Sequence, residues 1–295
     1  MTGRKVIITV APTGGLATKA DNPQLPTQPD EIAEDVVRCY EAGASIAALH
    51  ARRADDEATC DPLIYRAMNE LIRARCDIVI NNSTGGGVNG DLLGWNESGY
   101  HEVHWAERLR GLDGGADMCT LDAMTTFASV GGREVLLATQ PSRGRELAEG
   151  MRARGIKPEW EAFGPAHLVQ EIATLIGDGY DSPPYFVNLV LGLDTVFQGA
   201  LPYSPRNLQM MVDLLPERSL FTVSIVGDPD IDALVHALLL GGHVRVGLED
   251  NLRNAVGEPA TNLAVVERIV RVVRELGMEP ATAAEAREML GLERS

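Results

Sequence analysis

The chain has 295 residues, of which 45% are hydrophobic and 23% are charged, and its formal net charge at pH 7 is −16. This composition is typical of a globular protein, and the length suits either two ordinary domains or one large α/β barrel. The strong negative charge disfavours a surface that binds nucleic acid or an anionic membrane. No segment approaches 18 uninterrupted apolar residues, so we expect no membrane-spanning helix and no membrane partner.

Two further features indicate a cytoplasmic protein. The first residues run directly into a predicted strand, without the apolar segment of a signal peptide. The four cysteines show no CxxC spacing, and free thiols in a reducing compartment are their simplest interpretation. They are Cys39, Cys60, Cys76 and Cys119.

Short apolar runs of strand character alternate with amphipathic stretches from one end of the chain to the other. The predicted strands are residues 6–10, 45–50, 77–82, 117–121, 157–162, 185–191, 220–226 and 243–249. The predicted helices, with apolar residues three and four positions apart, are residues 29–41, 62–74, 143–154, 165–176, 205–215, 229–240 and 260–276. This alternation, with eight strands, predicts a parallel sheet closed into a (β/α)8 TIM barrel, with an open doubly wound sheet as the alternative fold.

The chain shows no linker and no break in composition, so residues 1–295 are predicted to form a single barrel domain. A C-terminal helical extension at residues 280–295, with its helix at residues 282–292, is expected to pack on the outside of the barrel. Residues 21–30 and 84–100 are expected to be the main irregular segments.

The last predicted strand carries charge along one face. Because side chains alternate along a strand, His243, Arg245, Gly247 and Glu249 share a face, and Asp250 joins Glu249 where the strand stops. Burying an arginine and a carboxylate is costly unless they pair or bind something. An internal ion pair that only fills the interior is one interpretation, and an active-site strand is the other. His243 is expected at the bottom of the barrel, as a structural residue.

Polar residues also stand at the ends of the other predicted strands. In (β/α)8 barrels the active site lies at the carboxyl ends of the strands, so these residues are expected to meet on one face. They are Thr13, His50, Arg52, Asn82, Ser83, Thr120, Asp122, Glu159, Glu161, Asn188 and Ser224. The glycine-rich segment 83–87 lacks the Lys-Ser/Thr ending of a phosphate-binding loop and is interpreted as a tight turn that presents Ser83.

A set of motifs extends over nearly the whole chain. They are TVAPTG at 9–14, NPQLP at 22–26, PDEIA at 29–33, AGASI at 42–46, HAR at 50–52, NSTGG at 82–86, KPEWE at 157–161, GGHVRVGLEDN at 241–251 and ATAAEAR at 281–287. Together they resemble the motifs of the β-keto acid cleavage enzymes, the family of 3-keto-5-aminohexanoate cleavage enzyme.

That resemblance implies a (β/α)8 barrel, commonly a homotetramer, with one divalent metal ion, usually zinc. It also implies an acyltransferase that exchanges acyl groups between a small β-keto acid and acetyl-CoA, which gives acetoacetate and a new acyl-CoA. A metal ion suits this chemistry, because deprotonation next to a ketone needs an electrophile on the ketone oxygen.

The resemblance also implies a role for each matching residue. His50 and Glu249 match metal ligands, and Asp250 matches the general base. Arg245 matches the group that orients and charges that corner of the site, and Ser83 its polar relay. The implied substrate-binding residues are Thr13, Gly86, Asp122, Thr120, which matches a contact to the substrate carboxylate, and Glu161, which matches a contact to its distal end.

The chain departs from the family pattern at the second strand, where Ala48 replaces the first histidine of a His-x-His pair. Catalytic zinc sites usually have three protein ligands, and only His50 and Glu249 remain. Three interpretations stay open: the metal persists with extra water, another side chain such as His101 or His104 fills the place, or the metal is lost.

Two further departures concern the substrate. Leu16 stands where the aminohexanoate enzyme carries a glutamate, and Asp122 stands where it carries an asparagine. We therefore do not transfer 3-keto-5-aminohexanoate as the substrate, and a cationic or polar β-keto acid stays open. Arg52, Arg53 and Arg110 are candidates for contacts with the phosphates of coenzyme A.

Two other functions stay open as well. One is a catalytically silent barrel that binds a keto acid or acyl-CoA after loss of a metal ligand. The other is a metal-dependent aldolase-type lyase, from which dependence on coenzyme A would separate the acyltransferase. Without a metal, Arg245 and Ser83 would have to stabilise the enolate unaided, and catalysis would be slow.

Overall fold

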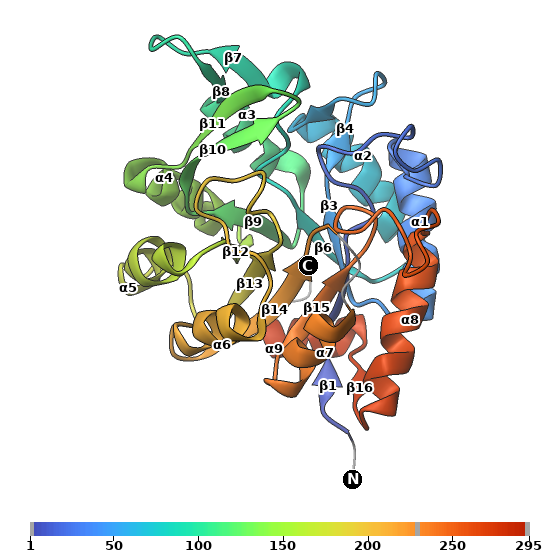
Figure 1. The fold of residues 1–295 in the computed structure, drawn as a ribbon. Helices are drawn as coiled ribbons and strands as arrows, with labels where there is room; N and C mark the ends of the chain where they lie inside the picture. The colour runs from blue at the N-terminus through green and yellow to red at the C-terminus, as the bar shows by residue number, and fades with distance from the viewer. Residues whose placement is uncertain (1–2, 228–230, 293–295) are drawn as a thin grey trace.

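The computed structural model describes residues 3–227 and 231–292. Eight parallel strands close into a barrel in the order β12-β13-β14-β15-β2-β3-β6-β9 (Figure 1). They are β2 (Ile8–Val10), β3 (Ile46–Leu49), β6 (Val79–Asn82), β9 (Met118–Asp122), β12 (Lys157–Ala162), β13 (Tyr185–Leu191), β14 (Ser219–Ile225) and β15 (His243–Val246). All eight come from the predicted runs, so the predicted TIM barrel is confirmed and the open sheet is excluded.

Helices connect the barrel strands and cover the outside of the barrel (Figure 1). They are α1 (Pro29–Ala42), α2 (Pro62–Arg73), α4 (Pro141–Ala153), α5 (Ala173–Gly177), α6 (Pro205–Asp213), α7 (Ile231–Leu239) and α8 (Asn262–Glu275). Several of them begin with a proline, whose missing N–H costs no hydrogen bond in the first turn.

Two helix predictions need adjustment. The helix expected at residues 165–176 begins as a π-helical segment, His167–Ile172, and continues as α5. The predicted start of the helix at residues 229–240 lies partly outside the described residues. Among the described residues, no helix is both long and apolar enough to cross a membrane.

Side chains alternate along the barrel strands, so one set points into the barrel and the other points outwards to the helices. Ile8, Val10 and Ile80 belong to the large outer cluster, together with helix residues such as Val36 and Met68. This layer between strands and helices is the main hydrophobic core, and it fixes the barrel that carries the site.

Helix α9 (Ala283–Leu290) closes the amino-terminal end of the barrel. Its residues Ala286 and Leu290 share a buried apolar cluster with Ile7, Val79 and Phe186, which come from the barrel strands or the residue just before them. Pairing of β1 (Lys5–Val6) with β16 (Glu279–Pro280) brings the end of the chain to this place. The prediction that the last helix packs on the outside was wrong, because its apolar face covers an otherwise open barrel end.

A second, smaller sheet lies above the barrel in Figure 1. Its order is β10-β11-β8-β7, and its strands are β7 (Leu93–Trp95), β8 (His101–Val103), β10 (Thr125–Val130) and β11 (Arg133–Ala138). Gly131 and Gly132 join β10 to β11 with φ of 57° and 74°, as a two-residue hairpin turn requires. Strand β7 lies within residues 84–100, so part of that segment, which was expected to be irregular, is ordered. The β10–β11 hairpin was not predicted.

Short elements complete the same region. They are the paired strands β4 (Ala51–Arg52) and β5 (Ala58–Thr59), helix α3 (Trp105–Arg110), and the 3₁₀ turns Gly90–Leu92 and Gly111–Gly114.

His243 is the first residue of β15 and is buried. Its Nδ1 accepts a hydrogen bond from the backbone N–H of Ile7 at 3.1 Å. Burial, reinforced by the charge of Arg4, lowers the pKa of His243 to about 4. A neutral imidazole at this place therefore belongs to the folded state, in line with its expected structural role.

This buried imidazole predicts a loss of stability in acid. The unfolded chain binds a proton at this residue below about pH 6.5 and the folded chain only below about pH 4, so His243 should lower the free energy of unfolding by about 2 kcal/mol between pH 8 and pH 5. His243→Asn keeps an acceptor for the Ile7 N–H but does not titrate, so its pH dependence should be weaker by that amount. Urea unfolding at both pH values measures the difference, and equal pH dependence in the two proteins would contradict it.

Candidate active site

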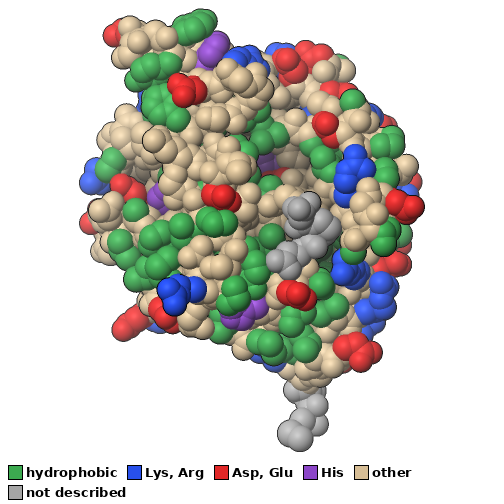
Figure 2. All heavy atoms as spheres, viewed as in Figure 1, with side chains coloured by type: hydrophobic (Ala, Val, Ile, Leu, Met, Phe, Trp, Pro, Cys, Tyr) green, Lys and Arg blue, Asp and Glu red, His purple; other side chains and the backbone are tan. Residues whose placement is uncertain are grey.

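A cavity of about 420 Å³ opens at the carboxyl ends of the barrel strands. Its polar lining consists of His50, Ser83, Asp122, Glu161, Arg245, Glu249, Asp250 and Arg253. All but the last of these were predicted site residues, and the fold brings them together from five barrel strands and the loops that follow them. On the described part of the face in Figure 2, acidic and basic side chains are intermixed. An anionic substrate therefore depends on the buried arginines of the cavity.

Arg245 is the centre of an ion-pair cluster. Its Nη2 and Nε donate to the two carboxylate oxygens of Asp250, at 2.6 and 3.1 Å. Nη2 also donates to Glu249 Oε1 at 3.0 Å, and Nη1 lies 3.5 Å from Glu161 Oε1. The Arg245 side chain is only 5% exposed, so three carboxylates replace the water around one buried guanidinium.

The chain reverses at Gly247 to make this cluster. β15 ends at Val246, three residues before the predicted end of the strand, and Gly247 has a φ of 151°. A Cβ at this position would stand 2.0 Å from the carbonyl oxygen of Ala11, so no other residue fits here. The resulting turn carries Glu249 and Asp250 back over Arg245, where a continued strand would have carried them away.

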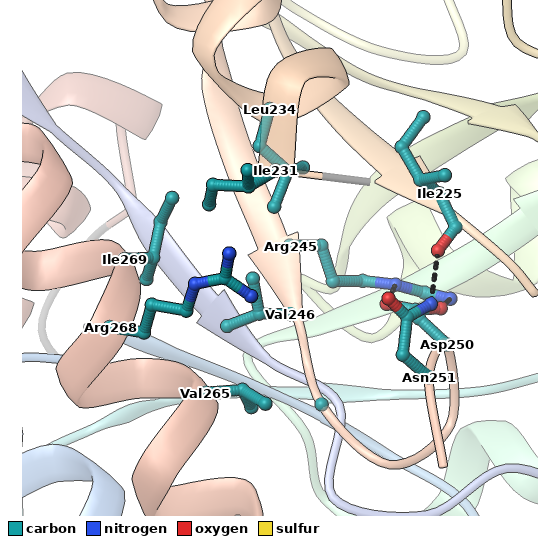
Figure 3. Close-up of a pocket in the computed structure, with 11 residues that line it drawn as sticks. Ile225, Ile231, Leu234, Arg245, Val246, Asp250, Asn251, Val265, Arg268 and Ile269 are labelled. Atoms are coloured by element: carbon teal, nitrogen blue, oxygen red, sulfur yellow. Dashed lines mark hydrogen bonds and ion pairs between the residues drawn. The ribbon is translucent and has the colours of Figure 1, made fainter. Parts of the chain in front are cut away.

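A small cavity of about 40 Å³ lies behind this turn, between β15, α7 and α8 (Figure 3). Ile231, Leu234 and Ile269 line it on the helix side. Asn251 donates to the carbonyl oxygen of Ile225 at 2.7 Å and ties the turn to β14. This volume has room for only a few water molecules, so it supports the turn and does not suit a substrate.

His50 lies beside Glu249 at the end of β3. Its Nδ1 donates to the carbonyl oxygen of Gly86 at 2.7 Å, because a carbonyl can only accept. When the ring is neutral, Nε2 is therefore the nitrogen without a hydrogen and carries the free lone pair. It lies 3.5 Å from Glu249 Oε1. The loop that holds His50 is tight: a Cβ on Gly15 would meet the Gly86 oxygen at 2.3 Å.

The two carboxylates beside Arg245 are held in different states. Burial alone would raise the pKa of Glu249, but the charges of Arg245 and His50 outweigh it and lower this pKa to about 2. Burial raises the pKa of Asp250 to about 6, against the opposing effect of Arg245. An ionised Glu249 next to a carboxylate that exchanges protons near neutral pH suits acid–base chemistry.

The opposite wall of the cavity carries a second set of paired carboxylates. Ser224 donates to Asn188 Oδ1 at 2.8 Å, and Asn188 Nδ2 donates to Glu161 Oε1 at 3.1 Å. Burial raises the pKa of Glu161 well above its usual range, and the charge of Asp122 and a hydrogen bond with it act in the same direction. Protonation of Glu161 is therefore easier than for an exposed glutamate, because it removes the repulsion from Asp122.

Arg108, on α3, pairs with Asp122 and is a site residue that the sequence did not reveal. Its Nη2 lies 3.6 Å from Asp122 Oδ2, and its Nε donates to the carbonyl oxygen of Thr84 at 2.9 Å. Its Nη1 donates to the hydroxyl of Thr139 at 2.6 Å. The side chain is 1% exposed, whereas Arg110 on the same short helix is half exposed. Nothing in the sequence distinguishes the two arginines.

The remaining predicted residues take different places. Ser83 lines the cavity, and its Oγ accepts from the Gly86 N–H at 3.3 Å. The Thr120 hydroxyl accepts from the Thr84 N–H at 3.1 Å and so shapes the same loop. Neither Thr120 nor the fully buried Thr13 is part of the cavity lining. Their contacts with a substrate stay predictions.

Two donors in this site fit a divalent cation. His50 Nε2 and Glu249 face one another, and Glu249 Oε2 has no hydrogen-bond partner although it is buried. Ala48 lies two residues before His50 on the same face of β3 and supplies no donor. In the part of the chain that the structure describes, no group of three or more histidine, cysteine or acidic residues converges as a metal site.

The histidines considered as replacements for the missing ligand lie elsewhere. His101 stacks on Trp95 with ring centroids 4.2 Å apart, and His104 stands at the start of α3. Neither lines the cavity. Of the three interpretations of Ala48, recruitment of one of these histidines finds no support in their positions.

Comparison with known proteins identifies the family. The sequence profile of the beta-keto acid cleavage enzymes matches residues 5–292. This chain belongs to the β-keto acid cleavage enzyme family. A 3-keto-5-aminohexanoate cleavage enzyme of Fusobacterium nucleatum is 36% identical over 292 residues, which cover 98% of this chain and 99% of that protein. The predicted family, and an enzyme that cleaves carbon–carbon bonds of β-keto acids, are thereby confirmed.

Other relatives carry different substrate names. A 3-dehydrocarnitine:acetyl-CoA trimethylamine transferase of Rhizobium meliloti is 33% identical and covers 98% of this chain and 97% of its own. Among solved structures, a complex of ObcA with oxaloacetate superposes with a TM-score of 0.73 at 22% identity. It covers 92% of this chain and 68% of that chain, and it supports the barrel fold.

The buried position of Arg108 predicts a large effect on stability. Arg108→Met leaves Asp122 buried without its cation, so the free energy of unfolding should fall by about 3 kcal/mol or more. Arg110→Met, two residues further along the same helix, removes only an exposed charge and should cost less than about 1 kcal/mol. Urea unfolding of both variants tests this, and similar losses in the two would show that the Arg108–Asp122 pair is not what holds this wall.

Proposed function

We propose that this protein exchanges acyl groups between a β-keto acid and acetyl-CoA, releasing acetoacetate and a new acyl-CoA. The observation that carries the proposal is the cluster in which Arg245 holds Glu249 and Asp250 beside His50 in the cavity at the carboxyl ends of the strands. Relatives named as acetyl-CoA transferases, which span nearly the whole chain, support the choice of co-substrate.

His50 and Glu249 would hold a divalent metal ion, for which zinc suits an imidazole and a carboxylate. When bound, such an ion supplies a Lewis acid for the ketone oxygen of the substrate. With two protein ligands, the metal would keep more water than in a site with three. The hydrogen bond from His50 Nδ1 to Gly86 fixes the ring so that Nε2 is available as the ligand.

Asp250 is placed to act as the general base. It accepts the proton from the carbon between the ketone and the carboxylate, and Arg245 fixes the orientation of its carboxylate through two hydrogen bonds. That carbon forms a new bond to the thioester carbonyl of acetyl-CoA, whose carbon–sulfur bond breaks and releases coenzyme A as the thiolate. Coenzyme A then attacks the former ketone carbon and breaks its bond to the acetoacetate moiety, so that no external oxidant or reductant is needed. Protonated Asp250 returns its proton to the acetoacetate carbanion that this last step releases.

The three arginines considered for contacts with the coenzyme A phosphates differ in how accessible they are. Arg52 is buried and donates to the backbone oxygens of Gly14 and Asp56, so it shapes the loop and is not available to a phosphate. Arg53 and Arg110 are exposed enough to meet an anion, although each already pairs with acidic neighbours. The homotetramer and the cytoplasmic location stay predictions.

The role of Asp250 predicts a specific loss of activity. Asp250→Asn keeps the shape of the side chain but removes the base, so acetyl-CoA-dependent loss of β-keto acid should slow by about a hundredfold or more. The matched control is Asp213→Asn, which changes an exposed carboxylate on α6 and should leave the rate unaltered.

The assay follows acetoacetate and acyl-CoA together. Formation of both only when acetyl-CoA is present supports the acyltransferase, whereas cleavage without coenzyme A would identify the aldolase-type lyase. Binding of keto acid or acyl-CoA without turnover, over a broad set of keto acids, would identify the silent barrel.

A second prediction concerns the metal. We expect the native protein to bind about one zinc per chain weakly, and Ala48→His to bind it more than about tenfold more tightly, because a third protein ligand is added on the same face of β3. Val256→His places a histidine on the exposed surface and controls for adventitious binding. Titration with zinc, followed by mass spectrometry of the dialysed protein, gives both quantities. Absence of binding by the native protein and by Ala48→His would refute the metal site.

A further inference from the structure

We infer that the β-keto acid cleaved here carries an uncharged hydrocarbon group at the end distant from its carboxylate, a substrate class that rests on the function proposed above. The inference comes from the two sides of the cavity. His50 and Glu249 follow β3 and β15, which flank β2 on one side of the barrel. β12 lies opposite β2 in the strand order, so we place the distal end of a bound keto acid on the other side of the barrel, at β12 and its neighbour β13.

Apart from Asp122 and Glu161, that second side is apolar. Its lining includes Met124, Leu137, Phe163, Val190, Leu193 and Phe197, which come from β11, from β13 and from the loops after β9, β12 and β13. They belong to a single hydrophobic cluster whose other members come from the small sheet and the loops around it. Removal of a hydrocarbon group from water against this wall is favourable, and burial of an ammonium group there without a partner is costly.

The apolar wall is held in a fixed shape. Phe163 and Phe197 meet edge to face with ring centroids 5.4 Å apart. The backbone N–H of Phe163 donates to His167 Nδ1 at 3.1 Å, which anchors the start of the loop after β12. Phe197 is tied to the hairpin through a bridge to Ala128. The wall is therefore preformed, as is usual for a site that selects substrates by shape and polarity.

The acidic side chains on this side are already compensated. Asp122 lies next to the guanidinium of Arg108. Glu161 lies next to that of Arg245 and accepts a hydrogen bond from Asn188. Asp122 is also the neighbour whose charge and hydrogen bond, after burial, raise the pKa of Glu161 well above its usual range. Each of the two acidic side chains already faces a guanidinium, so the wall offers no unpaired anion to a substrate ammonium.

The test compares two keto acids that differ only in charge at the distal end. 3-Oxo-5-methylhexanoate has a methyl group where 3-oxo-5-aminohexanoate has an ammonium group, with the same chain length and branch point. With acetyl-CoA and the zinc-loaded enzyme, kcat/KM should be about a hundredfold higher for the methyl compound. Equal values, or a preference for the amino compound, would overturn the inference.

Two variants connect the preference to the wall. Leu193 belongs to the wall and is only partly buried, so Leu193→Glu should fold and should move the ratio of the two kcat/KM values at least about tenfold towards the amino compound. Leu63→Glu, an exposed change on α2, should leave the ratio unaltered. Phe197→Ala should lower kcat/KM for the methyl compound about tenfold and affect the shorter 3-oxopentanoate less. A ratio that stays constant in Leu193→Glu and Phe197→Ala counts against the wall as the selective element.

3-Oxopentanoate separates the two levels of the proposal. Its turnover with acetyl-CoA depends on the reaction but hardly on the distal wall. Turnover of 3-oxopentanoate without discrimination between the longer compounds would leave the acyltransferase standing and remove the hydrocarbon substrate. Failure of all three compounds, in a protein that binds zinc and folds normally, would remove the acyltransferase itself.

Discussion

The buried guanidinium of Arg245 requires the geometry that surrounds it. A cation inside a barrel loses its hydration, and only several carboxylates with good hydrogen bonds offset that loss. Asp250 accepts two of its N–H groups, Glu249 accepts a third, and Glu161 approaches from β12. The sharp turn at Gly247 exists because Glu249 and Asp250 have to return over Arg245. The position of these carboxylates is thus a consequence of charge neutralisation within the barrel.

Arg108 applies the same solution to the other wall. It comes from a short helix in the loop after β6, and it supports Asp122 and the backbone at Thr84. Asp250, Glu161 and Asp122 are paired with arginines, whereas Glu249 Oε2, on the side chain that faces His50, has no hydrogen-bond partner among the described residues. Chemistry is therefore directed to one edge of the cavity, while the rest of the lining acts by shape and polarity.

The sequence predicted what depends on local periodicity and failed where distant contacts decide. Eight apolar runs separated by amphipathic stretches were enough for the barrel, and polar residues at strand ends were enough for the cluster around Arg245. Helix α9 was misplaced because its apolar face has the same spacing whether it covers the barrel's side or its end. The β10–β11 hairpin was missed although Gly131-Gly132 and the alternation around it are a usable signal. Arg108 could not have been distinguished from Arg110, because burial of one and not the other depends on the tertiary packing of α3.

The replacement at Ala48 has to be considered together with this charge balance. Arg245, Glu249 and Asp250 sum to one negative charge when both carboxylates are ionised, and Glu161 adds none while it is protonated. A divalent cation held by His50 and Glu249 changes that sum to one positive charge, which favours an anionic keto acid in the cavity. Loss of one neutral histidine ligand leaves this electrostatic effect intact, because imidazole contributes donor strength but no charge. On the proposed function, Ala48 would therefore weaken the binding of a metal ion more than the attraction between the metal-loaded site and its substrate.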